Sequence, residues 1–290
     1  VSADPLILSP HRLSPTAGGT PQVRERLFIL AFRPDGPELL NPEPLLSRDL
    51  SAGWNPASWK IADHLDNDDS IENLERFLLG EREVAWVDAW QAFVKCIESD
   101  DLPGFPLWVD AFCADPYIPN DTPRWKADFL SKNPEFYNSH QTTIDKWLAQ
   151  KWGPEKLSVA EFPNSRKKFE WQARSVQPTR EDRDLTKLVF QFRPSGIRVK
   201  PANYLPALVA ITQTSVIGSR MRRITPSEAA RLQGLPSDLF TGSGVGDAAA
   251  YKQLGNAVNT GVVRIAARAL FSAGRATWLA GSETNVGEAM

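Results

Sequence analysis

An uninterrupted apolar segment lies close to the amino terminus, where residues 27–32 read Leu-Phe-Ile-Leu-Ala-Phe. Six residues are too few for a persistent helix, and the lack of alternating polar residues is typical of a strand buried on both faces. Such a strand requires neighbouring elements on each side. Residues 34–44 contain prolines and glutamates and predict a linker that leaves this first domain for another.

The composition excludes several classes of protein. The 290 residues are 42% hydrophobic and 23% charged, which fits a globular protein of one or two domains. No apolar stretch approaches the roughly 18 residues of a membrane helix, and no signal peptide is recognisable, so we expect a cytoplasmic protein. The two cysteines, Cys96 and Cys113, and the three histidines lack the spacing of a disulfide framework or a zinc site, so no metal is expected.

Charge is divided unevenly along the chain. Residues 35–161 hold 11 basic and 24 acidic side chains, a net charge of −13, whereas residues 162–235 hold 14 basic and 5 acidic ones, a net charge of +9. This segregation indicates an anionic partner, with nucleic acid as the first candidate. The alternative is an acidic subdomain packed beside a basic one without any ligand, and charge alone does not separate the two.

Basic residues are interleaved with aromatic and turn residues between positions 162 and 200. Such side chains can neutralise phosphates, and arginine can also bind a guanine edge in the major groove. The alternative is a solvated loop whose aromatic residues lie in the core. The candidate DNA-binding residues are Arg166, Lys167, Lys168, Arg174, Arg193, Arg198 and Lys200.

Helical periodicity is clearest in the acidic, tryptophan-rich region. Apolar residues at a helical spacing predict a helix over 84–97, a preceding helix over 71–78 and a later one over 144–152. We expect these residues to be core residues, not a cofactor site. The region's role is left open: it could contact DNA, a partner or only itself.

Capping signals predict the helices near the carboxyl end. Thr225-Pro-Ser-Glu228 forms a capping box with proline at the first helical position, and Gly234 is expected to end that helix. The glycine-rich residues 241–247 predict a turn, because no strand precedes them and no Lys-Ser/Thr pair follows. The apolar spacing over 262–270 predicts a last amphipathic helix.

Three blocks, taken in order, resemble the carboxy-terminal half of the C5-cytosine DNA methyltransferases. Residues 21–29, Pro-Gln-Val-Arg-Glu-Arg-Leu-Phe-Ile, are similar to the family's Gln-x-Arg-x-Arg motif. Residues 223–236 are similar to the block that closes the target-recognition domain. Residues 251–258, Tyr-Lys-Gln-Leu-Gly-Asn-Ala-Val, are similar to the last motif, which helps to form the S-adenosylmethionine pocket. Between the first two blocks the resemblance is positional only.

The resemblance implies an α+β chain with a divided catalytic domain. A target-recognition domain with mixed helices and short strands would be joined to a strand and a helix of an incomplete α/β Rossmann-like methyltransferase domain. Residues 1–34 would be an edge segment of the catalytic domain and 35–220 the DNA-binding target-recognition domain. Residues 221–247 would form an inter-domain helix and loop, and 248–290 would return to the catalytic domain.

Arg24 and Arg26 are the candidate catalytic-site residues. At strand spacing both guanidinium groups can face one side and clamp a phosphate or a base. The resemblance implies that Arg26 reaches the flipped cytosine or its phosphate, and that Asn256, with Ala257, contacts the amino-acid end of S-adenosylmethionine. A structural set would organise the junction between domains: Gln22, Arg223, Glu228, Arg231 and Gln233. For the last four, ordinary capping and helix-surface pairing is the alternative.

The departures from the family concern the catalytic centre. The family's nucleophile is a cysteine in a Pro-Cys pair, but Cys96 follows Lys95 and Cys113 follows Phe112. The Glu-Asn-Val segment and the glycine-bearing start of the cofactor site are also absent, and in the family all of these precede the position of Gln22. The prolines common after the last motif are replaced by Asn259 and Thr260.

We therefore expect the recognition-bearing portion of a bacterial cytosine-5 DNA methyltransferase of a restriction-modification system. Its partners would be double-stranded DNA and an amino-terminal catalytic portion, held either on a separate subunit or on the same polypeptide. The cofactor would be S-adenosylmethionine, with an incomplete site here, and the isolated chain would be inactive. One alternative is a DNA-binding module without methyltransferase chemistry, and another is a globular fragment that binds nothing.

Overall fold

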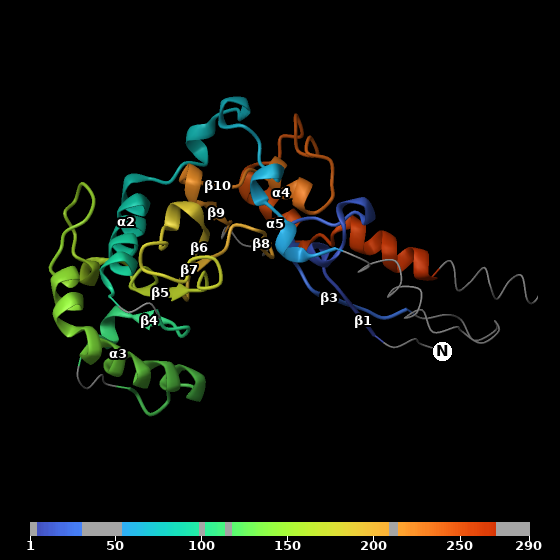
Figure 1. The fold of residues 1–290 in the computed structure, drawn as a ribbon. Helices are drawn as coiled ribbons and strands as arrows, with labels where there is room; N and C mark the ends of the chain where they lie inside the picture. The colour runs from blue at the N-terminus through green and yellow to red at the C-terminus, as the bar shows by residue number, and fades with distance from the viewer. Residues whose placement is uncertain (1–4, 31–53, 99–101, 114–117, 209–213, 271–290) are drawn as a thin grey trace, which may run out of the picture. The chain divides into compact units, whose positions relative to one another are not determined.

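The computed structural model describes residues 5–30, 54–98, 102–113, 118–208 and 214–270. They form two compact units of mixed helix and sheet (Figure 1). The first unit comprises Val1–Asp66, Asn203–Thr212 and Thr225–Met290, and the second comprises Asn67–Ala202 and Gln213–Ile224.

The second unit covers most of the expected DNA-binding domain, 35–220, but its boundaries differ. Within that range, the described residues 54–66 and 203–208 belong to the first unit. There the indole Nε1 of Trp59 donates to the His11 carbonyl at 2.8 Å, and Asn203 Nδ2 donates to the Ala57 carbonyl at 3.0 Å. These long-range contacts explain why the boundaries of the unit differ from the expected ones. The composition of the sequence carries no signal for such contacts.

The strands of the first unit form two short pairs. β1 (Leu6–Leu8) runs antiparallel to β3 (Arg26–Phe28), and β2 (Gln22–Val23) runs parallel to β8 (Leu205–Pro206). Three 3-10 turns and a longer one connect these strands: η1 (Pro10–Arg12), η2 (Pro15–Ala17), η3 (Pro56–Ser58) and η4 (Ile61–His64).

The expected strand over 27–32, buried on both faces, is wrong in its burial. Leu27 is 59% and Ile29 63% exposed, and Ile7, which lies opposite Leu27 across the pair, is 63% exposed. Side chains alternate along a strand, so Phe28 and Leu30 point to the other side and pack in the core. Residues 31 and 32 lie outside the described residues. We name the exposed side, Ile7, Leu27 and Ile29, the apolar ribbon face.

Three helical segments complete the first unit. They are α4 (Pro226–Leu232), α5 (Asp247–Asn256) and helical residues 260–270. The predicted capping box is confirmed, since Glu228 Oε2 accepts from the Thr225 amide at 2.8 Å and the Glu228 amide donates to Thr225 Oγ1 at 3.1 Å. The predicted last helix is also confirmed, and its buried residues pack on the covered side of the β1–β3 pair.

A six-stranded sheet forms the centre of the second unit, in the order β10-β9-β6-β7-β5-β4. Its members are β4 (Leu107–Trp108), β5 (Lys168–Trp171), β6 (Val189–Arg193), β7 (Gly196–Lys200), β9 (Val216–Ile217) and β10 (Arg222–Arg223). β5 and β7 are parallel, and the other neighbours are antiparallel. β4 is therefore an edge strand.

Two helices cover one face of this sheet (Figure 1). α2 (Glu81–Cys96) confirms the helix predicted over 84–97, and α3 (Arg124–Leu148) includes most of the later predicted one, with non-helical backbone at His140. The Trp90 ring stacks on Phe169 at 4.6 Å and contacts Trp147 at 5.1 Å, so an aromatic core joins helices and sheet.

The helix expected over 71–78 is wrong. Short turns occur instead, η5 (Asp68–Ser70) and η6 (Leu74–Arg76), and Leu78 then pairs with Arg222 in an isolated bridge. Further 3-10 turns are η7 (Val109–Ala111), η8 (Val159–Glu161), η9 (Leu185–Lys187) and η10 (Gly218–Arg220). Among the described helices, none is long and apolar enough to cross a membrane.

Candidate functional site

The second unit presents a cluster of cations on the side of the sheet that faces away from the aromatic core packed under α2 and α3. Alternation along β5, β6 and β7 places Phe169, Ile197 and Phe192 in the helix-covered core. The intervening positions therefore point to the other side. We name that side the basic sheet face: Lys168, Glu170, Arg193, Arg198 and Lys200.

One carboxylate on this face is paired. Arg198 Nε donates to Glu170 Oε2 at 2.7 Å across the β5–β7 pair. By contrast, the side chains of Lys168, Arg193 and Lys200 make no hydrogen bond or ion pair within the described parts of the chain. The face thus carries three cations that no neighbouring anion neutralises.

Burial and mutual repulsion lower the pKa values of these cations. For Arg193 and Lys200, burial lowers the pKa most and the charge of Arg198 lowers it further, while Glu170 acts in the opposite direction. The pKa of Lys168 is lowered by burial and then by the charge of Lys126. Crowded cations favour a bound anion, because an anion would relieve the repulsion.

Three further predicted DNA-binding residues, which lie outside the basic sheet face, also have internal contacts. The Arg166 guanidinium lies over the rings of Trp86 and Phe192, at 5.0 and 4.9 Å from the centroids, and donates to the Arg193 carbonyl at 3.1 Å. Such a stacked, half-buried cation supports the core. Arg166 therefore has internal partners in the second unit, and its contact with DNA stays a prediction.

Lys167 and Arg174 also have partners within the unit. Lys167 Nζ lies 3.4 Å from Asp110 Oδ1, and Arg174 Nη2 donates to the Leu102 carbonyl. Neither belongs to the basic sheet face, because Lys167 precedes β5 and Arg174 follows it. The seven candidates thus divide into four residues on one face and three outside it.

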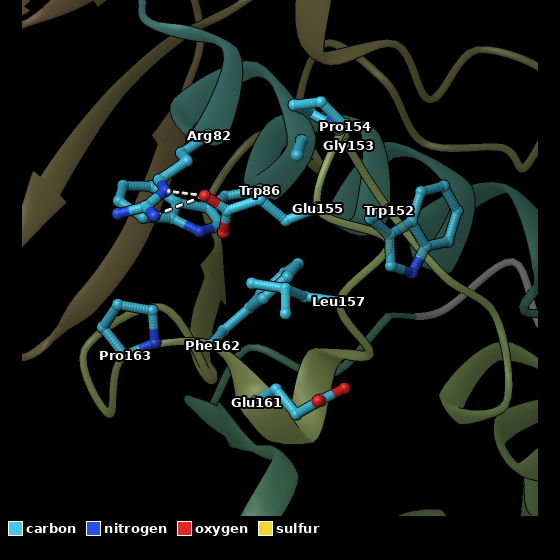
Figure 2. A pocket seen from close by; sticks show the side chains of 11 residues that line it. Arg82, Trp86, Trp152, Gly153, Pro154, Glu155, Leu157, Glu161, Phe162 and Pro163 are labelled. Carbon is cyan, nitrogen blue, oxygen red and sulfur yellow. Dashed lines mark hydrogen bonds and ion pairs between the residues drawn. The ribbon is translucent and has the colours of Figure 1, made fainter.

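A cavity of about 260 Å³ lies beside α2 in the same unit (Figure 2). Its walls are mainly apolar and include Trp86, Leu157 and Phe162. Arg82 Nε donates to Glu155 Oε1 at 2.7 Å at its rim, as Figure 2 shows. The ionisable side chains that line it are engaged in ion pairs, Arg82 with Glu155 and Glu161 with Lys151.

In the first unit the buried Arg24 binds three backbone carbonyls. Its Nη1 donates to Leu208 at 2.7 Å, and its Nη2 donates to Gly255 and Ala257, each at 2.7 Å. Burial, and then the charge of Arg26, lowers the pKa of Arg24 to about 10, so it stays protonated at neutral pH. The two carbonyls bound by Nη2 flank Asn256, so Arg24 fixes the turn at the end of α5.

Arg26 has a different environment. It is exposed, and its Nη1 donates to the Glu25 carbonyl at 2.7 Å. β2 ends at Val23 and β3 begins at Arg26, so the two arginines do not lie on one continuous strand. The expected joint clamp of Arg24 and Arg26 is wrong in geometry, because the Arg24 guanidinium is turned inward.

Asn256 is the last residue of α5, and Ala257 is its C-cap, with its amide donating to the Gln253 carbonyl at 2.9 Å. The Asn256 side chain is exposed and makes no hydrogen bond within the described residues. A free amide that can donate and accept suits the polar amino-acid end of a ligand. The structure therefore leaves the proposed contact atoms available on a fixed turn.

The expected structural residues make internal contacts. Gln233 Nε2 donates to Gln22 Oε1 at 3.0 Å. Glu228 Oε1 accepts from the Asp66 amide at 2.9 Å, and Arg231 Nη2 donates to Asp66 Oδ1 at 2.7 Å. Helix α4 therefore holds the chain segment around residue 66. In the second unit, the remaining member, Arg223, pairs with Glu83.

Asn259 is a residue whose role the sequence did not reveal. It is 1% exposed; its Oδ1 accepts from the Val262 amide at 3.2 Å, and its Nδ2 donates to Thr20 Oγ1 and the Leu232 carbonyl, each at 3.1 Å. It thus caps helical residues 260–270. An asparagine just before an apolar helical pattern is the signal that could have found it.

Cys96 does not have the setting of a nucleophile. The Cys96 thiol donates to the Phe93 carbonyl at 3.2 Å, and burial raises its pKa, which disfavours the thiolate. Cys113 is half-buried and follows Phe112. Over the described ranges, no group of three or more His, Cys, Asp or Glu residues is placed to hold a metal.

Comparisons with known proteins identify relatives. Residues 10–272 match the family of C-5 cytosine-specific DNA methylases. The type II methyltransferase M.AluI of Cellulosimicrobium cellulans is 34% identical over 343 aligned residues, covering 91% of this chain and 63% of the relative. The type II methyltransferase M.SsoII of Shigella sonnei is 49% identical over 55 residues, covering 19% of this chain and 14% of the relative. The search of solved structures found no match.

Proposed function

The chain belongs to the family of C-5 cytosine-specific DNA methylases, and from this premise we propose that it supplies DNA recognition and one side of the cofactor site to a cytosine-5 DNA methyltransferase. The names of both relatives support a place in a type II restriction-modification system. The partners would be double-stranded DNA and a catalytic portion that carries the nucleophile. The cofactor would be S-adenosylmethionine, which supplies the methyl group.

The observation that carries the proposal is the basic sheet face. Double-stranded DNA is a dense polyanion, and lysine and arginine side chains that contact its phosphates release counterions. Lys168, Arg193 and Lys200 are available for such contacts because none of them forms a side-chain hydrogen bond or ion pair with a described residue. Arginine can in addition bind a guanine edge bidentately, so Arg193 is the candidate for base reading.

The division of catalysis rests on the two thiols. In the complete enzyme the cytosine must leave the base stack, because its ring carbon is unreachable inside the duplex, and a cysteine thiolate must add to the ring. Cys96 is disfavoured as a thiolate, and neither cysteine follows a proline. We assign the nucleophile to residues outside this sequence.

The apolar ribbon face is the proposed contact for the catalytic portion. Ile7, Leu27 and Ile29 are exposed on one side of β1 and β3, whereas helical residues 260–270 cover the other side. Sheets of α/β domains carry helices on both faces. The chain spans 63% of the M.AluI relative, which therefore has additional residues that could supply such a cover. The ribbon and the last helix would then be parts of a Rossmann-like catalytic domain.

The residues of the α5 turn fit a cofactor contact. Asn256 presents an unpaired amide, and Arg24 holds the carbonyls on either side of it. In this proposal Asn256 and Ala257 orient the amino-acid end of S-adenosylmethionine, and Arg26, which is exposed, contacts the flipped cytosine or its phosphate.

The test has two stages. Fluorescence anisotropy with duplex DNA should show binding that weakens steeply as salt rises, because counterion release dominates. Radiolabelled methyl transfer should be absent for the chain alone and appear after the Pro-Cys-bearing portion is added. Turnover by the chain alone would contradict the division of labour, and the absence of DNA binding would contradict the recognition role.

A non-catalytic DNA-binding module is the second candidate, favoured by the absence of a Pro-Cys pair from this sequence. The adjacent coding sequence separates the two proposals. A neighbouring or continuous frame with Pro-Cys and Glu-Asn-Val supports the enzyme, whereas a frame that lacks them supports the module.

A further inference from the structure

Two lysines from distant parts of the chain lie against one tryptophan at the edge of the sheet. Trp108 is in the edge strand β4, and its register partner in β5 is Lys168. Lys168 Nζ is 4.6 Å from the centroid of the Trp108 ring, and Lys126 Nζ, from the first turn of α3, is 5.3 Å from the same centroid. We name these three residues the edge cluster.

Both ammonium groups lack an anionic partner. Neither Lys126 nor Lys168 forms a hydrogen bond or an ion pair with any described residue. The nearby carboxylate, Asp110, is engaged by Lys167 at 3.4 Å. Two like charges over one ring repel each other, and the quadrupole of the indole offsets only part of that repulsion.

We propose that the edge cluster binds a phosphodiester of the DNA backbone. This inference rests on the proposed DNA-binding function and extends it to Lys126 and Trp108, which lie in the acidic region, residues 35–161. An ammonium is a compact point charge that suits a phosphate oxygen, whereas it lacks the planar fork used for a base edge. Both ammonium groups lie within 5.3 Å of one ring centroid, and burial and then the charge of Lys126 lower the pKa of Lys168, so both can contact the same stretch of DNA backbone.

The position of the cluster supports DNA over a free anion. Lys168 belongs both to the edge cluster and to the basic sheet face, so the two are continuous. A strand of DNA that contacts Arg193 and Lys200 would meet the cluster where the sheet ends at β4. The acidic region then contributes a cation to the DNA site, although its net charge is −13.

The experiment measures duplex binding by anisotropy with the full chain, over a salt series between about 50 and 200 mM. The plot of log K against log salt has a negative slope. In the double variant Lys126→Gln/Lys168→Gln its magnitude should decrease by about 0.9, the value for one phosphate contact. That slope corresponds to binding about fivefold weaker at roughly 0.15 M salt. Lys146→Gln is the matched control, since it removes an exposed lysine from the same helix and should leave the slope unchanged.

Further variants separate the role of the ring from that of the charges. Trp108→Phe keeps an aromatic face and should retain the slope, whereas Trp108→Leu should reduce it, provided that both variants keep the wild-type melting temperature. Asp110→Asn removes the neighbouring negative charge and should strengthen binding. A reduced slope in the Lys146→Gln control equal to that of the double variant would overturn the proposal, because the effect would then be non-specific.

The remaining outcomes distinguish failure of the proposed DNA-binding function from failure of the edge-cluster proposal. If the wild-type chain does not bind duplex DNA, the proposed function fails. If it binds and the double variant keeps the full slope, the edge-cluster proposal fails and the proposed function stands. Calorimetry with inorganic phosphate is the arm for a free anion: saturable binding lost in the double variant, with DNA binding unchanged, would assign the cluster to a free phosphate and overturn the DNA assignment.

Discussion

Replacing Arg24 by methionine tests whether this arginine supports the α5 turn or contacts DNA. The substitution keeps the long side chain but removes the donors to the carbonyls of Leu208, Gly255 and Ala257. Leaving the buried Leu208 carbonyl without a donor costs about 1–3 kcal/mol, and each part-buried carbonyl loses a bond worth about 0.5–1.5 kcal/mol. We therefore expect the Arg24→Met variant to lose about 3 kcal/mol of local stability.

Hydrogen exchange measured by mass spectrometry locates this loss. The Ala257 amide donates to the Gln253 carbonyl at 2.9 Å, and its protection should fall on the order of 100-fold, the equivalent of about 3 kcal/mol. S-adenosylmethionine binding in the assembled enzyme should weaken in parallel. Duplex binding by the chain should keep its salt slope, because Arg24 is buried and turned inward.

Arg26→Met is the control, because Arg26 is exposed and bonds only to the Glu25 carbonyl among described groups. Its effect on stability should stay within about 0.5 kcal/mol. An Arg24→Met variant that keeps the Ala257 amide protected and loses DNA affinity would contradict the supporting role of Arg24. That pair of results would assign Arg24 the base or phosphate contact that strand spacing predicts for the Arg24 and Arg26 clamp.

Three further predictions concern the two units. Asp68→Asn should destabilise the second unit by about 2–3 kcal/mol in urea denaturation, because Asp68 Oδ1 accepts from the fully buried Arg222 at 2.8 Å. Burial alone would raise the pKa of Asp68, but hydrogen bonds from Arg220 and Arg222 lower it overall. The stabilisation from Asp68 is therefore present above its ordinary pKa and is lost as pH falls through the lowered pKa. When the urea midpoint is measured against pH in the acid range, the Asp68→Asn variant should lack this pH-dependent loss. Thr225→Ala should cost about 1 kcal/mol by removing the α4 cap, with Thr225→Ser retaining it, and equal melting temperatures for the two would contradict the capping role. Leu27→Asp should weaken association with the catalytic portion by about 10- to 100-fold, the value of one buried leucine, while Leu239→Asp, at another exposed leucine, should not; equal effects in a pull-down titration would remove the apolar ribbon face from the interface.

Local patterns were predicted from the sequence with good accuracy. The capping box of α4 involves residues three positions apart, and the apolar stripe of α2 repeats every three or four residues, so each signal lies within one element. The prediction of a helix over 71–78 was wrong because Leu78 pairs with Arg222, a strand contact from far along the chain. Periodicity carries no information about such a partner.

The arginines of the Gln-x-Arg-x-Arg motif show the same limit at the candidate site. Alternation on one strand predicts a shared face for Arg24 and Arg26, but the carbonyls that bind Arg24 belong to residues more than 180 positions away. The apolar segment that begins at Leu27 similarly predicts burial, yet hydrophobicity does not say whether this chain or a partner supplies the cover. In both cases the missing information is a long-range contact.

Only some of the cations in residues 162–235 are placed to bind an anion. The net charge of +9 predicts an anionic partner, but Arg166 lies against two aromatic rings and Arg198 is paired with Glu170. A paired or stacked cation must give up its internal partner before it can bind phosphate, so its contribution to affinity is reduced. Arg193 and Lys200 make no side-chain hydrogen bond, ion pair or ring contact within the described residues, so they would add their full electrostatic contribution. Recognition should therefore depend on the cations that the fold leaves without an anion, and the strands, not the composition, select them.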